Sequence, residues 1–279
     1  MAKTNMKLGI QMWSIHNVFV EQGFEKTAKE IRAMGYEGLE FALGGSPTLS
    51  DRCGYPVDPK EVRKQLLDNG VEPLGSHIAF GAFLEDPDTV LGECLDLGIK
   101  YAAIGPAFEG DRTPHEDQIE KYRQIAAAAK KFKENGIQFQ VHCAVYGYLH
   151  NYKGRPTYQG MIEEAGVDLI QPEFDTAWMI CSGNDPVELL EKYKGHVDIL
   201  HFKDYHPIPY SSDYILVQHN EVCDHHFGCA VGDNGVQDVG QIVDAADQCG
   251  VKWVLTELWN EPNSMENAKI SADNILKYL

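Results

Sequence analysis

The sequence predicts a (β/α)₈ TIM barrel, because one unit repeats along the chain. An amphipathic stretch ends in glycine and an apolar, strand-like stretch follows, with strands expected to begin near residues 8, 37, 71, 100, 137, 168, 196 and 251. Most starts lie about 30 residues apart, which fits one strand plus one helix. A doubly wound open sheet is the alternative, but QMWSIHNVF after the first strand lacks a glycine-rich phosphate turn.

The helix boundaries support the same pattern. Asp58, Asp86 and Asp185 each precede a proline, which places an N-cap acceptor before a residue suited to the first helical position. Glycines are expected to end the helices, because glycine adopts the left-handed conformation at the least steric cost. The expected positions are Gly35, Gly70, Gly98, Gly136, Gly166, Gly195 and Gly250.

Composition narrows the classes of protein to consider. The 279 residues contain no linker or low-complexity segment, so we expect one domain over residues 1–279. The net charge of −18 disfavours nucleic acid and anionic membranes as partners. There is no signal-like start and no apolar run of about 20 residues. Seven cysteines without a C-x-x-C pair indicate free thiols. We therefore expect a cytoplasmic location.

One connection is longer than the others. Residues 205–237 form an insertion after the seventh strand, rich in tyrosine and histidine. In a barrel it would emerge at the catalytic face, where long loops are usually functional. We expect it to cover the active site as a lid, or to contact a partner subunit or a second copy of the chain.

Polar residues gather where the predicted strands end, which is where barrel active sites form. Asp175, His201 and Glu257 end strands six, seven and eight. Two carboxylates and an imidazole suit a divalent metal ion, although each could also be a satisfied polar residue at the rim. Lys203 shares a strand face with His201, whereas Asp204 points the other way and is expected to position the loop. Other polar residues at strand ends are Gln11, His16, Glu40, His77, Gln140, His142 and Glu173.

The segment FDTAWMICSGNDPVELLEKYKGHVDILHFKD, residues 174–204, resembles strands six and seven of the sugar phosphate isomerase/epimerase family, the xylose isomerase-like barrels. The resemblance extends to LGIQMWSIHNVF, GYEGLEFA and ENAKISADNILKYL and covers nearly the whole chain. It implies one divalent ion, Mn²⁺ first and Mg²⁺, Co²⁺ or Zn²⁺ otherwise. The ligands that it implies are Asp175, His201, Glu257 and a residue of strand five.

Strand five departs from the family pattern. Gln140 stands where most members carry a ligating Glu, and His142 matches the first His of a branch with Tyr-His-Asn-His. Both side chains face the same way. Gln140 offers a carbonyl oxygen but cannot act as a base, whereas His142 can be a ligand or a proton carrier. The fourth ligand therefore stays open between them.

The resemblance implies an isomerase or epimerase that acts on a sugar, keto-sugar or polyol through an enediolate. Glu257 or His142 would take the proton, with Lys203 near a substrate oxygen. Trp13, His77, Trp178 and Trp259 are the other expected substrate contacts. Because strand five lacks its Glu, a hydratase or lyase on a 3-keto-sugar, keto-glycoside or inosose is the alternative, and a non-catalytic barrel subunit is a second. A DNA-repair nuclease on this barrel is disfavoured by the acidic charge.

Overall fold

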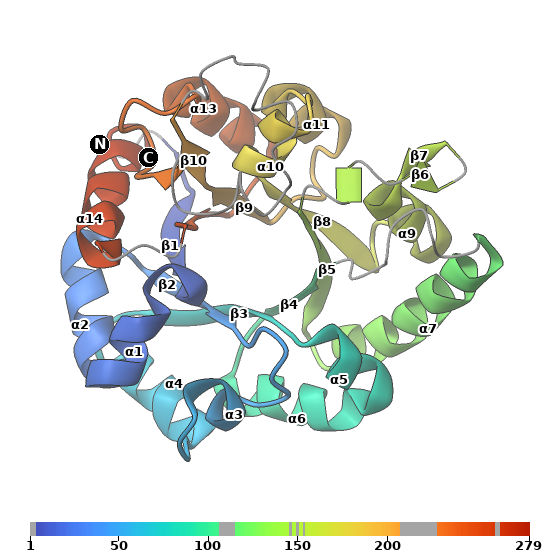
Figure 1. Cartoon of the computed structure of the whole chain (residues 1–279), viewed down its shortest axis with the longest axis horizontal. Coiled ribbons are helices and arrows are strands. Elements are labelled where there is room, and N and C mark those ends of the chain that lie inside the picture. Colours follow the sequence, from blue (N-terminus) through green and yellow to red (C-terminus); the bar gives the residue numbers. More distant parts are fainter. Residues whose placement is uncertain are drawn as a thin grey trace, which may run out of the picture.

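The computed structural model describes residues 4–105, 115–144, 147–148, 151–152, 154–206, 228–259 and 263–279. Eight parallel strands close into a barrel in the order β1-β12-β9-β8-β5-β4-β3-β2, with helices around it (Figure 1). The predicted (β/α)₈ barrel is thus confirmed, with each strand within three residues of its expected start. The strands are β1 (Lys7–Gln11), β2 (Gly38–Ala42), β3 (Glu72–His77), β4 (Tyr101–Ile104), β5 (Gln138–Cys143), β8 (Ile170–Asp175), β9 (Ile199–Phe202) and β12 (Trp253–Thr256).

The predicted helix signals also hold. The side chains of Asp58, Asp86 and Asp185 accept hydrogen bonds from backbone N–H groups of the first turn, and all seven predicted glycines have positive φ. The helices are η1 (Met12–Ile15), α1 (His16–Gln22), α2 (Phe24–Met34), α3 (Leu49–Cys53), α4 (Pro59–Asp68), α5 (Phe80–Glu85), α6 (Pro87–Leu97), α7 (His115–Glu134), α9 (Thr157–Ala165), α10 (Thr176–Cys181), α11 (Pro186–Lys192), α13 (Val239–Cys249) and α14 (Ser264–Ile275). No helix among these residues is long and apolar enough to cross a membrane.

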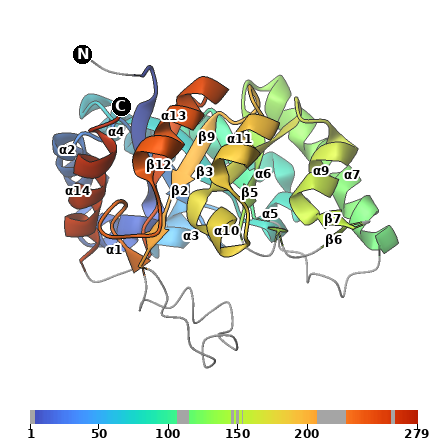
Figure 2. The ribbon, with the colours of Figure 1, turned by 90° about the horizontal axis from the view of Figure 1, so that it is seen from above.

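The short helices α1, α3 and α10 lie at one end of the barrel, the lower end in Figure 2. They follow the carboxyl ends of β1, β2 and β8. The interior near the opposite end is an apolar floor made of Leu74, Tyr101, Ile199, Trp253 and Leu255. Gly38 leaves room for this floor, since a β-carbon there would lie 2.7 Å from the Trp253 ring. Side chains further along the same strands therefore stack above an apolar base.

The base of the long insertion is closed by a small sheet. β10 (Asp204–Tyr205) pairs antiparallel with β11 (Gly228–Cys229). The buried carboxylate of Asp204 accepts hydrogen bonds from the backbone N–H groups of Gly232, at 3.0 Å, and Val236, at 3.1 Å. Asp204 thus holds the two ends of the insertion together, as its alternation with Lys203 predicted. Residues 207–227, the middle of the insertion expected at 205–237 as a lid, lie outside the described residues.

A second two-stranded sheet, β6 (Asn151–Tyr152) with β7 (Arg155–Pro156), follows β5. Six cysteines within the described ranges are free, and five of these are buried, as the cysteine pattern predicted. Cys223 lies outside those ranges.

Candidate active site

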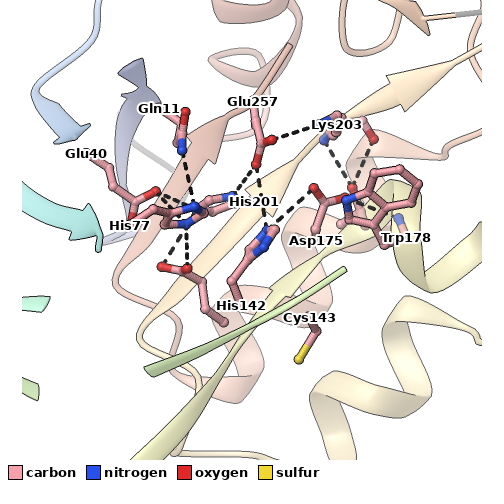
Figure 3. Close-up of polar contacts among 12 residues, drawn as sticks. Gln11, Glu40, His77, His142, Cys143, Asp175, Trp178, His201, Lys203 and Glu257 are labelled. Carbon is pink, nitrogen blue, oxygen red and sulfur yellow. Dashed lines mark hydrogen bonds and ion pairs between the residues drawn. The ribbon is translucent and has the colours of Figure 1, made fainter. Parts of the chain in front are cut away.

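Four ionisable side chains at the carboxyl ends of β5, β8, β9 and β12 lie close together above the apolar floor. His201 and Glu257 each stand two residues beyond a floor residue, Ile199 and Leu255, and so share its inward face. Asp175 is opposite His201 in the register of β8 with β9. His142 on β5 completes the set, which Figure 3 shows as side chains pointing toward one another.

The metal-type group consists of His142, Asp175, His201 and Glu257. One ligand atom from each lies within 4.8 Å of the others. His201 Nδ1 is 2.7 Å from Glu257 Oε2, while His142 Nε2 is 3.8 Å from Glu257 and 3.9 Å from Asp175. All four side chains are buried. This donor set fits a divalent cation, since buried carboxylates and imidazoles need partners.

Two observations test the fit of a cation to this group. Asp175 Oδ2 and His142 Nε2 are buried and have no hydrogen-bond partner, so each has a free lone pair or proton position. Burial and the charge of Glu257 raise the pKa of Asp175 to about 7 although Lys203 and His201 oppose the rise, so the charged form of Asp175 is not fully compensated. A divalent ion would satisfy both atoms and lower that pKa.

Gln140 lies on the same face of β5 as His142, but two residues nearer to the apolar floor. It stands opposite Gln171 in the register of β5 with β8, whereas His142 stands opposite Glu173. Two residues of strand separate Gln140 and His142 by roughly 6.6 Å. Gln140 is fully buried, and neither of its amide atoms has a hydrogen-bond partner. Of the two strand-five candidates, His142 therefore has the position that matches the other three side chains.

A second carboxylate and imidazole group adjoins the first and shares His201. It contains Glu40 from β2, His77 from β3 and Glu173 from β8, with ligand atoms again within 4.8 Å. His201 Nε2 lies 2.9 Å from Glu40 Oε2, and His77 Nε2 is hydrogen-bonded to Glu173 at 2.9 Å. The rings of His77 and His201 are stacked, with centroids 5.3 Å apart. This group surrounds the inner side of His201.

The proton on His77 follows from a backbone donor. The N–H of Trp13 donates to Gln11 Oε1 at 2.6 Å, so the amide nitrogen of Gln11 is the atom that faces His77 Nδ1, at 3.4 Å. Nδ1 therefore accepts, and the proton of neutral His77 is on Nε2, toward Glu173. Burial opposes a charged His77, but Glu40 and Glu173 outweigh it and raise its pKa. Gln11 thus sets the tautomer only in the neutral form of this histidine, which the sequence marked as a substrate contact.

The charged neighbours lower the pKa of one buried carboxyl, Glu173, and raise that of another, Glu40. Burial opposes the ionisation of Glu173, but the charges of His201 and His77 outweigh it and lower its pKa to about 2. Burial and the charge of Glu173 raise the pKa of Glu40 to about 7. Burial also opposes a charged His201, but Glu40 and Glu173 outweigh it and hold the pKa of His201 well above its usual value.

Lys203 lies beside Glu257 in an aromatic enclosure. Its Nζ is 2.7 Å from Glu257 Oε1, 4.4 Å from the centroid of the Trp259 ring and 5.4 Å from that of Trp178. Burial opposes the ionisation of Glu257, but Lys203 and His201 keep the pKa of Glu257 well below its usual value. The two indoles meet edge to face, with centroids 5.3 Å apart, and Trp259 donates from Nε1 to the carbonyl of Asp204 at 2.6 Å.

The structure thus gathers most of the predicted site residues and changes the surroundings of some. Trp178 and Trp259 are almost fully buried around Lys203, whereas Trp13 is 38 % exposed and is the predicted tryptophan with an open surface. The sequence placed Gln11, Glu40 and Glu173 at strand ends without giving them a role. Their signal was a polar residue on the inward face of an otherwise apolar strand.

The family model for the xylose isomerase-like TIM barrel matches residues 28–278. The chain belongs to this family. An inosose dehydratase from Clostridium perfringens is 25% identical, with 73% of this chain and 73% of that protein covered. A sugar phosphate isomerase/epimerase from Parabacteroides distasonis has a TM-score of 0.78 at 18% identity, over 99% of this chain and 95% of that one.

A third member of the comparison is a structure of the IOLI protein with a binding zinc atom. Its TM-score is 0.72 at 15% identity, over 98% of this chain and 99% of that one. These structural similarities establish the fold. Membership of the xylose isomerase-like family, together with the sequence relatives, points to an enzyme that modifies a sugar.

Proposed function

We propose that this protein is a divalent-metal-dependent enzyme that isomerises or epimerises a sugar, keto-sugar or polyol. The observation that supports this most directly is the metal-type group: His142, Asp175, His201 and Glu257 end four neighbouring strands and bring their ligand atoms within 4.8 Å. Mixed carboxylate and imidazole ligands suit Mn²⁺, Co²⁺ or Zn²⁺ better than Mg²⁺. Mn²⁺ is the ion that we expect first.

When bound, the ion would polarise a substrate carbonyl and stabilise the negative charge left by a departing C–H proton. Glu257 is the group that can accept that proton, through the carboxylate oxygen that the ion does not take, and His142 is the alternative acceptor where it is not a ligand. Lys203 keeps Glu257 ionised, and burial, with the charge of His77, lowers the pKa of His142 to about 3, so that its imidazole is neutral. Lys203 then lies where it can donate a hydrogen bond to a substrate oxygen.

A metal-dependent hydratase or lyase on a keto-sugar or inosose is the second candidate. Two curated relatives carry the name inosose dehydratase. The position of Lys203, with its Nζ 2.7 Å from the Glu257 carboxylate, also suits this chemistry. Elimination of water requires a donor for the departing hydroxyl as well as a base for the C–H proton, and Lys203 and Glu257 provide such a pair side by side.

The experiment combines metal analysis with a substrate screen in D₂O. Freshly purified protein should contain one divalent ion per chain, a chelator should abolish turnover, and Mn²⁺ should restore it. A panel of free, phosphorylated and 3-keto sugars and inososes, followed by NMR, separates the reactions. Isomerisation or epimerisation keeps all the atoms of the substrate apart from the exchange of hydrogen for deuterium at carbon, whereas dehydration removes water.

Asp175→Asn tests the assignment of the ion to this group, with Asp198→Asn as its matched control. Asp198 is also a buried aspartate, but it lies by the floor of the barrel, where Tyr101 and Lys252 contact it. Asp175→Asn should lose metal and turnover, and Asp198→Asn should keep both. Protein that takes up no metal and turns over no member of the panel would instead support a non-catalytic barrel subunit.

A further inference from the structure

Arg52 is an arginine without a carboxylate partner in a strongly acidic chain. The net charge is −18, yet no described carboxylate forms an ion pair with Arg52, and its Nε is buried without a hydrogen-bond partner. Burial lowers the pKa of the guanidinium from its usual value, and the one described acidic group that opposes this shift is the Cys53 thiol rather than a carboxylate. One explanation for a buried donor without a partner is a site at which a ligand supplies the acceptor.

The position of Arg52 is set by the loops after β1 and β2. Its guanidinium lies 5.5 Å from the centroid of the Trp13 ring. On the other side the chain passes closely at Gly44, where a β-carbon would lie 3.6 Å from Nη1. Stacking on an indole holds the planar guanidinium in one orientation. Arg52 is therefore positioned, although its Nε donor has no partner.

A second unsatisfied polar group lies beside it. The Nδ1 atom of His16, the first residue of α1, is buried and has no hydrogen-bond partner. Burial lowers the pKa of His16, and the positive charge of Arg52 lowers it further. His16 is therefore neutral at physiological pH and can donate from one ring nitrogen. The Nε–H of Arg52 requires an oxygen acceptor, and His16 can donate to the same acceptor in the tautomer that carries its proton on Nδ1.

This pair of donors is connected to the active site through Trp13. The backbone N–H of Trp13 is bonded to Gln11, whose amide faces His77 in the second carboxylate and imidazole group. The indole of Trp13 contacts the guanidinium of Arg52, and Trp13 is 38 % exposed. Helices α1 and α3, which supply His16 and Arg52, lie at the same end of the barrel (Figure 2).

We propose that Arg52, His16 and Trp13 form a subsite for an anionic oxygen group, a phosphate or a carboxylate, carried by the substrate at a distance from its metal-binding end. The assignment to a substrate rests on the proposed function, whereas binding of the anion does not. The guanidinium fork matches two oxygens of either anion. The acidic surface does not prevent this contact, because charges beyond about 8 Å are largely screened at physiological ionic strength.

The test uses metal-free protein, so that the outcome is independent of the metal site. Inorganic phosphate is titrated into chelator-treated protein while the Arg Nε–H resonances are followed by NMR. We expect saturable binding that shifts one arginine resonance, which Arg52→Gln removes. Arg52→Gln should weaken phosphate binding about tenfold or more, because it removes the charge-assisted hydrogen bonds of the guanidinium. Arg123→Gln, on the outer helix α7, is the control and should leave binding unchanged.

Further arms identify the anion and protect against a folding artefact. Acetate replaces phosphate to compare a carboxylate, and glucose serves as the uncharged probe and should not shift the Arg52 resonance. Arg52→Lys keeps the charge but loses the fork, so intermediate binding is expected, and His16→Asn provides a variant that leaves Arg52 in place. Failure of wild-type protein to bind either anion, or equal binding by wild type and Arg52→Gln, would overturn the proposal and leave the metal-dependent function standing.

Discussion

His201 faces Glu40 with one ring nitrogen and Glu257 with the other, at 2.9 Å and 2.7 Å. Nδ1 is hydrogen-bonded to Glu257, a member of the metal-type group. A metal ion bound there would take Nδ1 and displace its proton, which leaves the proton of the neutral ring on Nε2, toward Glu40. Glu40 comes from β2 and His201 from β9, which do not pair with each other in the sheet. A contact across the barrel thus orients the proposed ligand.

The first prediction concerns Glu40. Glu40→Leu removes the oxygen that holds His201 and should lower the affinity for Mn²⁺ by about tenfold to a hundredfold, the usual effect of losing a group that orients a ligand. Glu40→Gln keeps an acceptor and should lose less. Calorimetric titration of metal-free protein measures the affinity. Glu72→Gln, at the amino end of β3, is the control. Equal affinity in Glu40→Leu and wild type would show that Glu40 does not position His201.

A second prediction separates the two candidates on β5. His142→Ala should lower Mn²⁺ affinity by about tenfold or more, because it removes an atom of the metal-type group. Gln140→Ala should leave that affinity unchanged, since Gln140 lies about two residues along β5 from His142, nearer to the apolar floor. Both variants create a buried cavity, so each serves as the stability control for the other. The reverse order of affinities would assign the ligand to Gln140.

The third prediction concerns Lys203. Lys203→Met keeps the aliphatic stem between the two indoles but removes the ammonium next to Glu257. We expect a large loss of kcat with metal content retained, because the donor to a substrate oxygen is gone. Lys252→Met, which breaks the contact with Asp198 near the barrel floor, is the matched control. Wild-type kinetics in Lys203→Met would mean that Lys203 serves only as a buried salt-bridge partner.

A fourth prediction concerns pH. In metal-free protein Asp175 has a pKa of about 7 and the pKa of His201 is raised, so both hold protons below neutral pH that a metal ion must displace. Mn²⁺ affinity should therefore rise with pH, by about tenfold per pH unit for each proton displaced. The folded state binds the Asp175 proton more tightly than the unfolded chain does, so metal-free protein should lose stability as pH rises through 7.

Calorimetry in buffers of different ionisation enthalpy counts the protons released, and thermal unfolding with and without Mn²⁺ checks the stability trend. Asp175→Asn removes the titrating carboxyl and should flatten the stability curve of metal-free protein. A Mn²⁺ affinity that does not change with pH would contradict the assignment of Asp175 and His201 as ligands.

The barrel could be predicted from the sequence because its signals are local. A proline after Asp58 or a glycine at position 98 acts within one turn of chain, and repetition of such signals gives the topology. Inward-facing positions such as His201 and Glu257 follow from strand alternation. These features need no knowledge of distances between strands.

The contacts across the barrel could not be predicted in the same way. Glu40 and His201 are 161 positions apart in the sequence, and their distance depends on the stagger of every strand between them. The tautomer of His77 depends on a backbone N–H at Trp13. The roles of Trp178 and Trp259 depend on how deeply each indole is buried. The sequence does not distinguish a buried indole that packs around Lys203 from an exposed indole on which a sugar could stack.

The contact of Asp204 with Gly232 and Val236 has a consequence for the evolution of this barrel. Asp204 already holds the two ends of the insertion close together. The entropic cost of closing the loop between them therefore rises only slowly as residues are added. Segments of different length and composition can be exchanged between β10 and β11 without moving His201 or Lys203. Substrate range can therefore diversify through this one connection while the reaction centre is conserved.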